Sequence, residues 1–359
     1  APFSAEDIWL KLRNANDEES VHLTSWPTKP FKLFSFGKST IVPNMEVVRK
    51  IVTLGLEARQ KAGIKVRQPL SKLEIKNYEL EIEYTELIKD ELNVKEITED
   101  KNILGEIELD TNITPALKAE GEYREFMREL QDRRKQMGLN PGDKMSMSIS
   151  DVYKKYKIMP NLAMHMLRVA AVATIICDNF DKPLPKDEII TACLLHDMGN
   201  IIKSNFEFLP DFLGSEGKDY WQAVKNEYIN KYGRDEHRAT VQILKELNLP
   251  HNIISLIDQN RFSLLCNLQE SDNFKMKIIK YSDLRASPHG IVSYEERMAE
   301  AQTRYKTKNV EEENERQRLV ACGRDIERQI FAHCKIKPED ITDDSVVPII
   351  AELKNFMVK

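Results

Sequence analysis

The chain has 359 residues and a formal net charge of −5, because 58 Asp and Glu residues outnumber 53 Lys and Arg residues. At roughly 100–200 residues per domain, this length predicts two domains and excludes a single small module. With 41% hydrophobic and 31% charged residues, the composition excludes wholesale disorder, and the charge excludes a global positive field for unspecific nucleic-acid binding.

The first 150 residues predict a mixed α and β region. Apolar residues recur at helical spacing between residues 44 and 61, and Gly63 follows where a helix C-cap is expected. An aromatic and proline-rich stretch from 26 to 36 predicts irregular chain. On the same reasoning we expect helices over residues 4–13, 44–61, 85–91 and 115–136, and strands over residues 64–66, 79–84, 94–97 and 106–109.

Five strings in this region carry a family resemblance. In chain order they are APFSAEDIWLKLR (1–13), ESVHLTSWP (19–27), EARQKAGIKVRQPL (57–70), ELIKDELNVKEI (86–97) and ELDTNITPALKAEGEYREFMRELQDRRKQMGL (108–139). They resemble the C-terminal region of class I isoleucyl-tRNA synthetases, in the family's order. The resemblance implies the end of a helical anticodon-binding domain over residues 1–40, a small α/β appendage over 41–150, and contact with a tRNA of the isoleucine type.

Two groups of basic side chains are candidates for this tRNA contact, since guanidinium and ammonium groups bind phosphates. One surrounds a helix end and the other follows the helix over 115–136; together they are Arg59, Lys61, Lys65, Arg67, Arg124, Arg128, Arg133 and Arg134. The alternative is a solvated face, because Glu residues at i,i+4 spacing interleave with the second group.

The synthetase signatures for ATP are missing from the sequence. No HIGH-like string occurs, and the segment from Lys144 to Ser148 imitates KMSKS but has Met147 in place of the second Lys, so we interpret it as an alternating strand. The chain also begins at Ala1 inside a helical pattern, which suggests a fragment or a processed product. As given, the chain is therefore not expected to activate isoleucine.

From about residue 151 the apolar pattern is helical throughout, which predicts an all-α domain over residues 151–359. The predicted fold class is thus multidomain, with an N-terminal α+β part and a C-terminal all-α part. The expected helices cover residues 159–179, 185–196, 219–232, 236–247, 250–258, 274–282, 293–305, 310–334 and 344–359.

Four side chains in this domain are candidate metal ligands. His165 lies among Leu162, Met166 and Val169 on one helix face, and His196-Asp197 closes an apolar run that began at Ile189. Asp283 ends a similar run. Imidazole and carboxylate groups are the ligands expected for a borderline or hard divalent ion.

These residues resemble the H…HD…D signature of the HD superfamily of metal-dependent phosphohydrolases. The strings MHMLRVAAVA, CLLHDMGNIIK and KYSDLRASPHG support the resemblance, which covers residues 151–305. It implies one divalent ion (Mn, Mg, Co, Fe or Zn) held by His165, His196, Asp197 and Asp283. It also implies hydrolysis of a phosphoester that is a nucleotide or is related to RNA.

Further residues around this site have predicted catalytic or phosphate-binding roles. The predicted catalytic residues are Asp197, His237 and Lys203, and the predicted phosphate-binding residues are Arg168, Lys203, Arg285 and His289. For each of these basic residues, the alternative interpretation is an ordinary charge on the protein surface. Two-metal HD enzymes carry further histidines, and no histidine occurs near 258–260, so one ion is favoured.

Five cysteines, all after residue 150 and none in a CxxC pair, predict reduced thiols without a disulfide framework. No stretch has the 18 consecutive apolar residues of a spanning helix, and no secretory signal is evident, which predicts a cytoplasmic protein without a membrane partner. Three hypotheses remain: a tRNA-binding portion of an isoleucine-tRNA ligase fused to an HD hydrolase; a non-catalytic tail of such a ligase with a regulatory HD part; or two unrelated genes joined.

Overall fold

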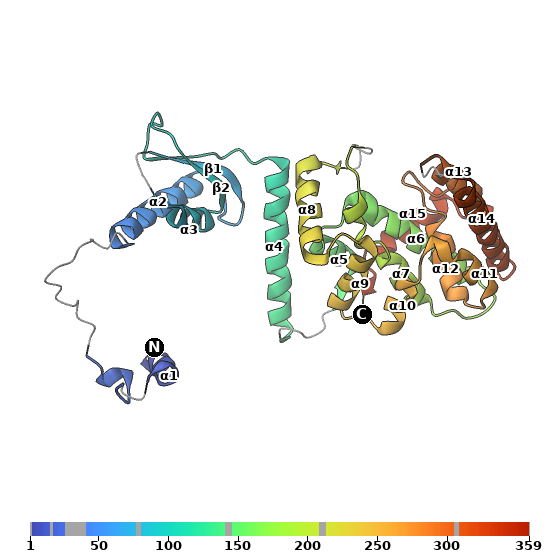
Figure 1. Cartoon of the computed structure of the whole chain (residues 1–359), viewed down its shortest axis with the longest axis horizontal. Helices are drawn as coiled ribbons and strands as arrows, with labels where there is room; N and C mark the ends of the chain where they lie inside the picture. Colours follow the sequence, from blue (N-terminus) through green and yellow to red (C-terminus); the bar gives the residue numbers. More distant parts are fainter. Residues whose placement is uncertain are drawn as a thin grey trace.

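The computed structural model describes residues 2–14, 17–25, 41–76, 80–140, 146–207, 213–304 and 309–358. Within these ranges a small three-stranded sheet with two helices lies in the N-terminal part, and helices make up nearly all of the C-terminal part (Figure 1). This confirms the predicted multidomain fold class. The predicted domain limits at 40 and 150 remain predictions.

The chain starts with helix α1 (Pro2–Leu12) and the short 3-10 helix η1 (Val21–Leu23). The Glu6 carboxylate joins them, since it accepts hydrogen bonds from Ser20 Oγ (2.8 Å) and from the Val21 amide (3.2 Å). The predicted first helix is confirmed. The predicted irregular stretch over 26–36 lies outside the described residues.

The α/β region combines α2 (Ile41–Lys61), β1 (Leu70–Ile75), α3 (Ile82–Leu92), β2 (Val94–Glu99) and β3 (Ile107–Leu109). The strand order is β2-β1-β3, with β1 parallel to β2 and antiparallel to β3. Its core is built from Ile51, Leu73, Ile88 and Leu92, all fully buried. Gly55 allows α2 to approach α3, because a Cβ there would lie 2.4 Å from the Leu92 side chain.

Two of the predicted strands are wrong. Residues 64–66 are not in a strand. The chain turns at residues 66–67, where the Gln68 amide donates to the Lys65 carbonyl oxygen and the guanidinium of Arg59 donates to the carbonyl oxygens of Lys65 and Gln68; strand β1 follows this turn. For the predicted strand over 79–84, residue 79 lies outside the described residues, and α3 begins at Ile82, since Ile88 and Leu92, four residues apart, both enter the core.

Helix α4 (Pro115–Gln136) has the predicted limits and lies between the two parts of the molecule (Figure 1). Thr114 caps it by accepting from the Leu117 amide. Towards the α/β region, Arg124 donates to Asn93 Oδ1 (2.7 Å), and towards the C-terminal region Leu130 enters the larger core.

The C-terminal region is helical apart from a short ladder between β4 (Met147–Ser148) and β5 (Met357–Val358), which was not predicted as a pair. Met147–Ser148 is extended as expected of the KMSKS-like segment, whereas Lys144 and Met145 lie outside the described residues. The helices are α5 (Ile149–Lys155), α6 (Pro160–Asn179), α7 (Lys186–Leu195), α8 (Gly217–Tyr232), α9 (Glu236–Glu246), α10 (His251–Asp258), α11 (Leu265–Glu270), α12 (Phe274–Asp283), α13 (Tyr294–Arg304), α14 (Val310–Phe331) and α15 (Asp343–Leu353). Of these, α5 and α11 were not predicted.

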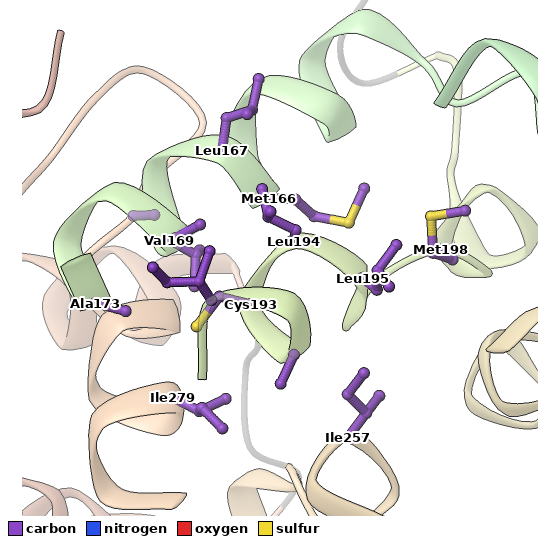
Figure 2. Close-up of a cluster of buried hydrophobic side chains, with 14 of the residues drawn as sticks. Met166, Leu167, Val169, Ala173, Cys193, Leu194, Leu195, Met198, Ile257 and Ile279 are labelled. Carbon is purple, nitrogen blue, oxygen red and sulfur yellow. The ribbon is translucent and has the colours of Figure 1, made fainter. Parts of the chain in front are cut away.

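Helices α6, α7 and α12 pack together as the centre of this region. Figure 2 shows Met166 and Val169 of α6 against Cys193 and Leu194 of α7, with Ile279 of α12 beside them. All five side chains are fully buried, and each such burial contributes about 1.5–3 kcal/mol to the stability of the fold. The core therefore fixes the three elements that carry His165, His196 and Asp283.

Helix α6 is long and apolar enough to cross a membrane, judged by length and composition among the described residues. Half of the window that meets this test is buried inside the protein. Because core helices pass the same test, this is weak evidence for a membrane span.

The prediction of five reduced thiols is wrong for one pair. Cys266 of α11 and Cys322 of α14 form a disulfide across 56 residues, while Cys177, Cys193 and Cys334 are free. Two cysteines so far apart in the sequence give no spacing signal, because their proximity depends on how α11 packs against α14.

Candidate metal centre

His165 lies on the inner face of α6, one turn after Asn161. The core positions the start of the helix, since Met159 is buried and Pro160 takes the first helical position. The Nε2 atom of His165 lies 3.7 Å from Asp197 Oδ2 and 3.3 Å from Asp283 Oδ1. The imidazole thus faces two carboxylates that come from other elements.

His196 and Asp197 stand where α7 ends. The chain turns there into the 3-10 helix η2 (Asn200–Lys203), and Gly199 permits close contact with α9, because a Cβ would lie 2.2 Å from the Glu236 carbonyl oxygen. The Nδ1 atom of His196 is 2.8 Å from the Cys193 carbonyl oxygen. When the imidazole is neutral, this contact places its proton on Nδ1 and leaves the lone pair of Nε2 facing the cluster.

The Nε2 atom of His196 is buried and has no hydrogen-bond partner among the residues that the structure describes, although Asp197 Oδ2 (3.6 Å) and Asp283 Oδ1 (3.5 Å) are close. Burial lowers the pKa of His196, but the two carboxylates outweigh it and raise the pKa to about 9. In this state the imidazole is therefore a cation between two anions.

Asp283, the last residue of α12, is held from both sides. Its Oδ1 faces the two imidazoles, and its Oδ2 lies 3.1 Å from the ammonium of Lys280, a side chain that is only 7% exposed. Burial raises the pKa of Asp283, but Lys280 and the two histidines outweigh it, so the pKa lies well below its usual range. The carboxylate is ionised, as a metal ligand must be.

The donor set fits a divalent cation. The ligand atoms of His165, His196 and Asp197 all lie within 4.8 Å of one another, and Asp283 Oδ1, at 3.3 and 3.5 Å from the two imidazoles, adds a fourth ligand atom. Two nitrogens and two oxygens suit borderline and hard ions. An unpartnered buried imidazole nitrogen is a further sign that the cluster is built for an additional ligand.

Next to this cluster lies a cavity of about 1200 Å³, lined by all four of these residues and also by Lys203 and His237. His237 Nε2 lies 2.8 Å from Asp258 Oδ1, and Lys203 Nζ lies 3.7 Å from Glu236 Oε1. The fold therefore brings all three predicted catalytic residues, Asp197, Lys203 and His237, to the cavity.

Arg285 is a wrong prediction as a phosphate-binding residue. Its side chain is 3% exposed, and its guanidinium donates to Tyr281 Oη and to the carbonyl oxygens of Val292, Pro338 and Ile341. All its donors face the protein interior, so Arg285 has a structural role.

The other three predicted phosphate-binding residues remain predictions, and of these Lys203 lines the cavity. Arg168 donates to the Pro288 carbonyl oxygen (3.1 Å), and His289 is exposed in the loop that follows. Pro288 itself lines the cavity, so both residues lie near its edge.

Arg59 is likewise wrong as a tRNA contact. It is 1% exposed and donates to the carbonyl oxygens of Leu92 and Asn93, besides those of Lys65 and Gln68. Desolvation lowers its pKa. Its guanidinium ties α2 to the end of α3 and so stabilises the α/β region.

The remaining candidate tRNA contacts are on the surface, and most face a carboxylate. The carboxylate of Glu125 forms ion pairs with Lys65 Nζ (3.9 Å), Arg67 Nη1 (3.6 Å) and Arg128 Nε (3.1 Å). Arg124 pairs with Glu120 and Arg133 with Asp151, while Arg134 donates to the Asn140 carbonyl oxygen and Lys61 is exposed. These contacts agree with the solvated-face alternative and leave tRNA binding open.

Several cavity residues were missed in the sequence. Lys280 is three residues before Asp283 and Asn161 four before His165, so helical spacing alone placed each on the face of a candidate ligand. Asp258, the partner of His237, and Arg261 and Arg297, which line the cavity, had no such signal.

Comparisons with known proteins agree with this division. Residues 162–321 match the family model described as HD domain, and residues 1–75 match the anticodon-binding domain of tRNA ligase. HD domains are the signature of a superfamily of metal-dependent phosphohydrolases. No solved structure matches the chain.

The curated relatives are similar to the N-terminal part. Isoleucine–tRNA ligase of Clostridium kluyveri is 43% identical over 99 residues, 27% of this chain and 9% of that protein. The ligase of Clostridium novyi is 31% identical over 169 residues, 45% of this chain and 16% of that protein, and that of Pyrobaculum aerophilum is 33% identical over 168 residues, 43% and 17%. The chain thus joins an anticodon-binding segment related to isoleucine–tRNA ligases, of whose length it spans about a sixth or less, to an HD domain.

Proposed function

We propose that the C-terminal region hydrolyses a phosphoester with one divalent ion held by His165, His196, Asp197 and Asp283. The observation that carries the proposal is the convergence of these side chains from three separate elements. Both imidazoles lie 3.3–3.7 Å from the two carboxylates, and His196 Nε2 has no hydrogen-bond partner among the described residues. Bound there, a divalent ion lowers the pKa of a coordinated water and stabilises charge on a phosphate oxygen.

The chain's own residues supply the remaining roles in this proposal. Cys193 fixes the tautomer of His196, and Lys280 orients Asp283. The Nε2 atom of His237 is held by Asp258. In this proposal, Nδ1 of the same ring carries the proton that passes to the leaving oxygen of the phosphoester. Lys203, more than half exposed at the cavity, places an ammonium near the phosphate oxygens.

Release of phosphate from a panel of nucleotides with Mn²⁺, Mg²⁺ or Co²⁺ tests this activity. We expect release by the wild type and its loss in Asp197→Ala, with Asp219→Ala, an exposed carboxylate of α8, as the matched control. Equal activity in wild type and Asp197→Ala, or no release with any metal, would contradict the proposal.

We also propose that the N-terminal part binds tRNA, with isoleucine-specific tRNA as the partner. The support is the match of residues 1–75 to an anticodon-binding domain and the identity to isoleucine–tRNA ligases. In the alternative form of this proposal, an aminoacylation core lies upstream and the HD part is regulatory. Cytoplasmic location stays a prediction.

A filter-binding comparison of isoleucine tRNA with an unrelated tRNA tests the partner. We expect tighter binding of isoleucine tRNA. Equal, weak binding of both with a steep dependence on salt would reduce the contact to general electrostatics.

A further inference from the structure

Helix α14 is held to the rest of the protein unevenly along its length. In its C-terminal half, Ile326 and Ile330 are buried, and Glu327 Oε2 accepts a hydrogen bond from Tyr281 Oη (2.6 Å). In its N-terminal half, none of residues 310–318 is buried. Because segments with few buried apolar contacts open locally at a low free-energy cost, the N-terminal half depends on how the middle of the helix is held.

The middle of α14 is held by a disulfide, a hydrogen bond and a buried side chain. Cys322 is bonded to Cys266 of α11, which lies beside α14 (Figure 1). The Val320 carbonyl oxygen accepts a hydrogen bond from Tyr294 Oη of α13 (2.9 Å), and Leu319 is the buried side chain. Of these three contacts, the disulfide is the one that a reductant can break and an oxidant can restore.

The same half of α14 is a wall of the large cavity beside the candidate metal centre. On the other side of the disulfide, Arg261 and Phe262 line that cavity shortly before α11 begins. The cavity-lining residues of α14 all precede Cys322; they are Glu311, Glu312, Glu315, Arg316, Leu319 and Val320. The disulfide therefore joins two segments that both continue into the cavity wall, so a change in its redox state reaches that wall.

The two sulfur atoms differ in accessibility. Cys266 is buried, whereas the Cys322 side chain is partly exposed, so a small thiol in solution reaches Cys322 Sγ first. Burial raises the pKa of the free Cys177 thiol to about 12 and that of Cys334 to about 11. Thiolates are the attacking species in disulfide exchange, so these internal thiols compete poorly with a reductant from outside.

We propose that the Cys266–Cys322 disulfide is a redox-controlled lock on the α14 wall of the cavity. A thiolate of a small dithiol attacks Cys322 Sγ, the S–S bond breaks, and Cys266 leaves as a thiolate that takes up a proton. The second thiol of the reductant then displaces Cys322, which is protonated in turn. Two electrons and two protons pass to the protein, and the reductant ends as a disulfide. Reduction frees residues 310–318 to move away from the cavity, and oxidation fixes them against it.

Hydrogen exchange of the full chain, measured by mass spectrometry of peptides, tests the lock without requiring turnover. We expect peptides from residues 310–320 to exchange at least about tenfold faster after reduction by dithiothreitol, because a disulfide restricts the open states of the segments that it joins. Peptides from residues 166–173, in the core of α6, should change less than twofold. Alkylation in denaturant should leave Cys266 and Cys322 unmodified until the reductant is added.

Two variants make the test specific. Cys322→Ser, which cannot form the disulfide, should exchange like the reduced wild type with and without reductant. Cys334→Ser removes a free thiol and should respond to dithiothreitol as the wild type does. The reduced wild type carries no substitution, so the test is decided even where a variant does not fold.

Three results would overturn the inference. One is alkylation of both Cys266 and Cys322 without reductant after incubation with oxidised glutathione. Another is equal exchange of residues 310–320 in the oxidised and reduced protein. The third is an equal acceleration in α6, which would make the disulfide a general staple of the fold. The inference goes beyond the proposed hydrolysis, and failure of that activity leaves it standing.

Discussion

The candidate metal centre and the basic surface of α4 differ in how their charged side chains are grouped and paired. At the metal centre, two imidazoles and two carboxylates are brought together in a partly buried cluster, and His196 Nε2 is left without a hydrogen bond. On α4 and the turn before β1, Lys65, Arg67 and Arg128 share the carboxylate of Glu125 at the surface. The first arrangement leaves a buried nitrogen without a hydrogen-bond partner among the described residues, whereas in the second each of the three cations faces a carboxylate at the surface.

The largest effect is expected for the loss of the Asp197 carboxylate from the metal centre. We expect Asp197→Ala to lower phosphate release by roughly 10³-fold or more, because a metal supplies several kcal/mol of charge stabilisation in such reactions. The metal content of the purified variant, measured by mass spectrometry, should fall with it. Full metal content together with full activity would show that the cluster is a structural one.

A substitution of Arg59 tests the structural role of a buried cation in the α/β region. Arg59→Met leaves four carbonyl oxygens without their buried donor, and we expect the α/β region to lose about 3 kcal/mol of unfolding free energy. Native-state hydrogen exchange of the β1 and β2 amides measures this loss. Arg67→Met, at a side chain that is 55% exposed, is the control and should change protection little; equal effects in both would contradict the structural role.

Proton release tests the electrostatics of the metal centre. The pKa of His196 is about 9 in the metal-free state, and a metal binds only the neutral imidazole, so we expect Mn²⁺ binding at pH 7.5 to release about one proton. Because this folded-state pKa lies above the ordinary value of 6.5, the stabilisation of the metal-free protein by the charged imidazole is complete below pH 6.5. It is lost as the pH rises through about 9.

Calorimetry in two buffers with different ionisation enthalpies measures the released proton. His251→Gln, at an exposed histidine, should release the same amount as the wild type. A binding enthalpy that is identical in both buffers would contradict a protonated His196.

The smallest effects belong to the basic surface. Lys65→Ala should weaken tRNA binding only about threefold, since the ammonium already faces Glu125. Glu125→Gln releases three cations at once and should strengthen binding by a similar factor. Filter binding at two salt concentrations measures both, and a tenfold or larger loss in Lys65→Ala would show that this surface is a dedicated phosphate site.

Much of the fold followed from local pattern. Long helices with a clear apolar face, such as α4 and α6, were predicted within one residue, because burial of that face decides their limits. Strand β1 was missed, since its position depends on hydrogen bonds from Arg59 to the preceding turn. The Cys266–Cys322 disulfide likewise depends on packing between α11 and α14.

The candidate site shows the same division. His165, His196, Asp197 and Asp283 stand out in the sequence because each interrupts an apolar helical run. The phosphate-binding role predicted for Arg285 was wrong. The sequence alone does not distinguish a basic residue that faces a cavity from one that donates to carbonyl oxygens such as that of Ile341. Pairs such as His237 with Asp258, 21 residues apart, appear only when the chain folds.

The central claim is that four side chains from three elements hold one divalent ion. Crystals of the full chain grown with Mn²⁺ and measured for anomalous scattering test it most directly. We expect a single strong anomalous peak within coordination distance of His165 Nε2, His196 Nε2 and carboxylate oxygens of Asp197 and Asp283. The absence of a peak among these atoms, or a peak bound only by residues elsewhere in the chain, would contradict it.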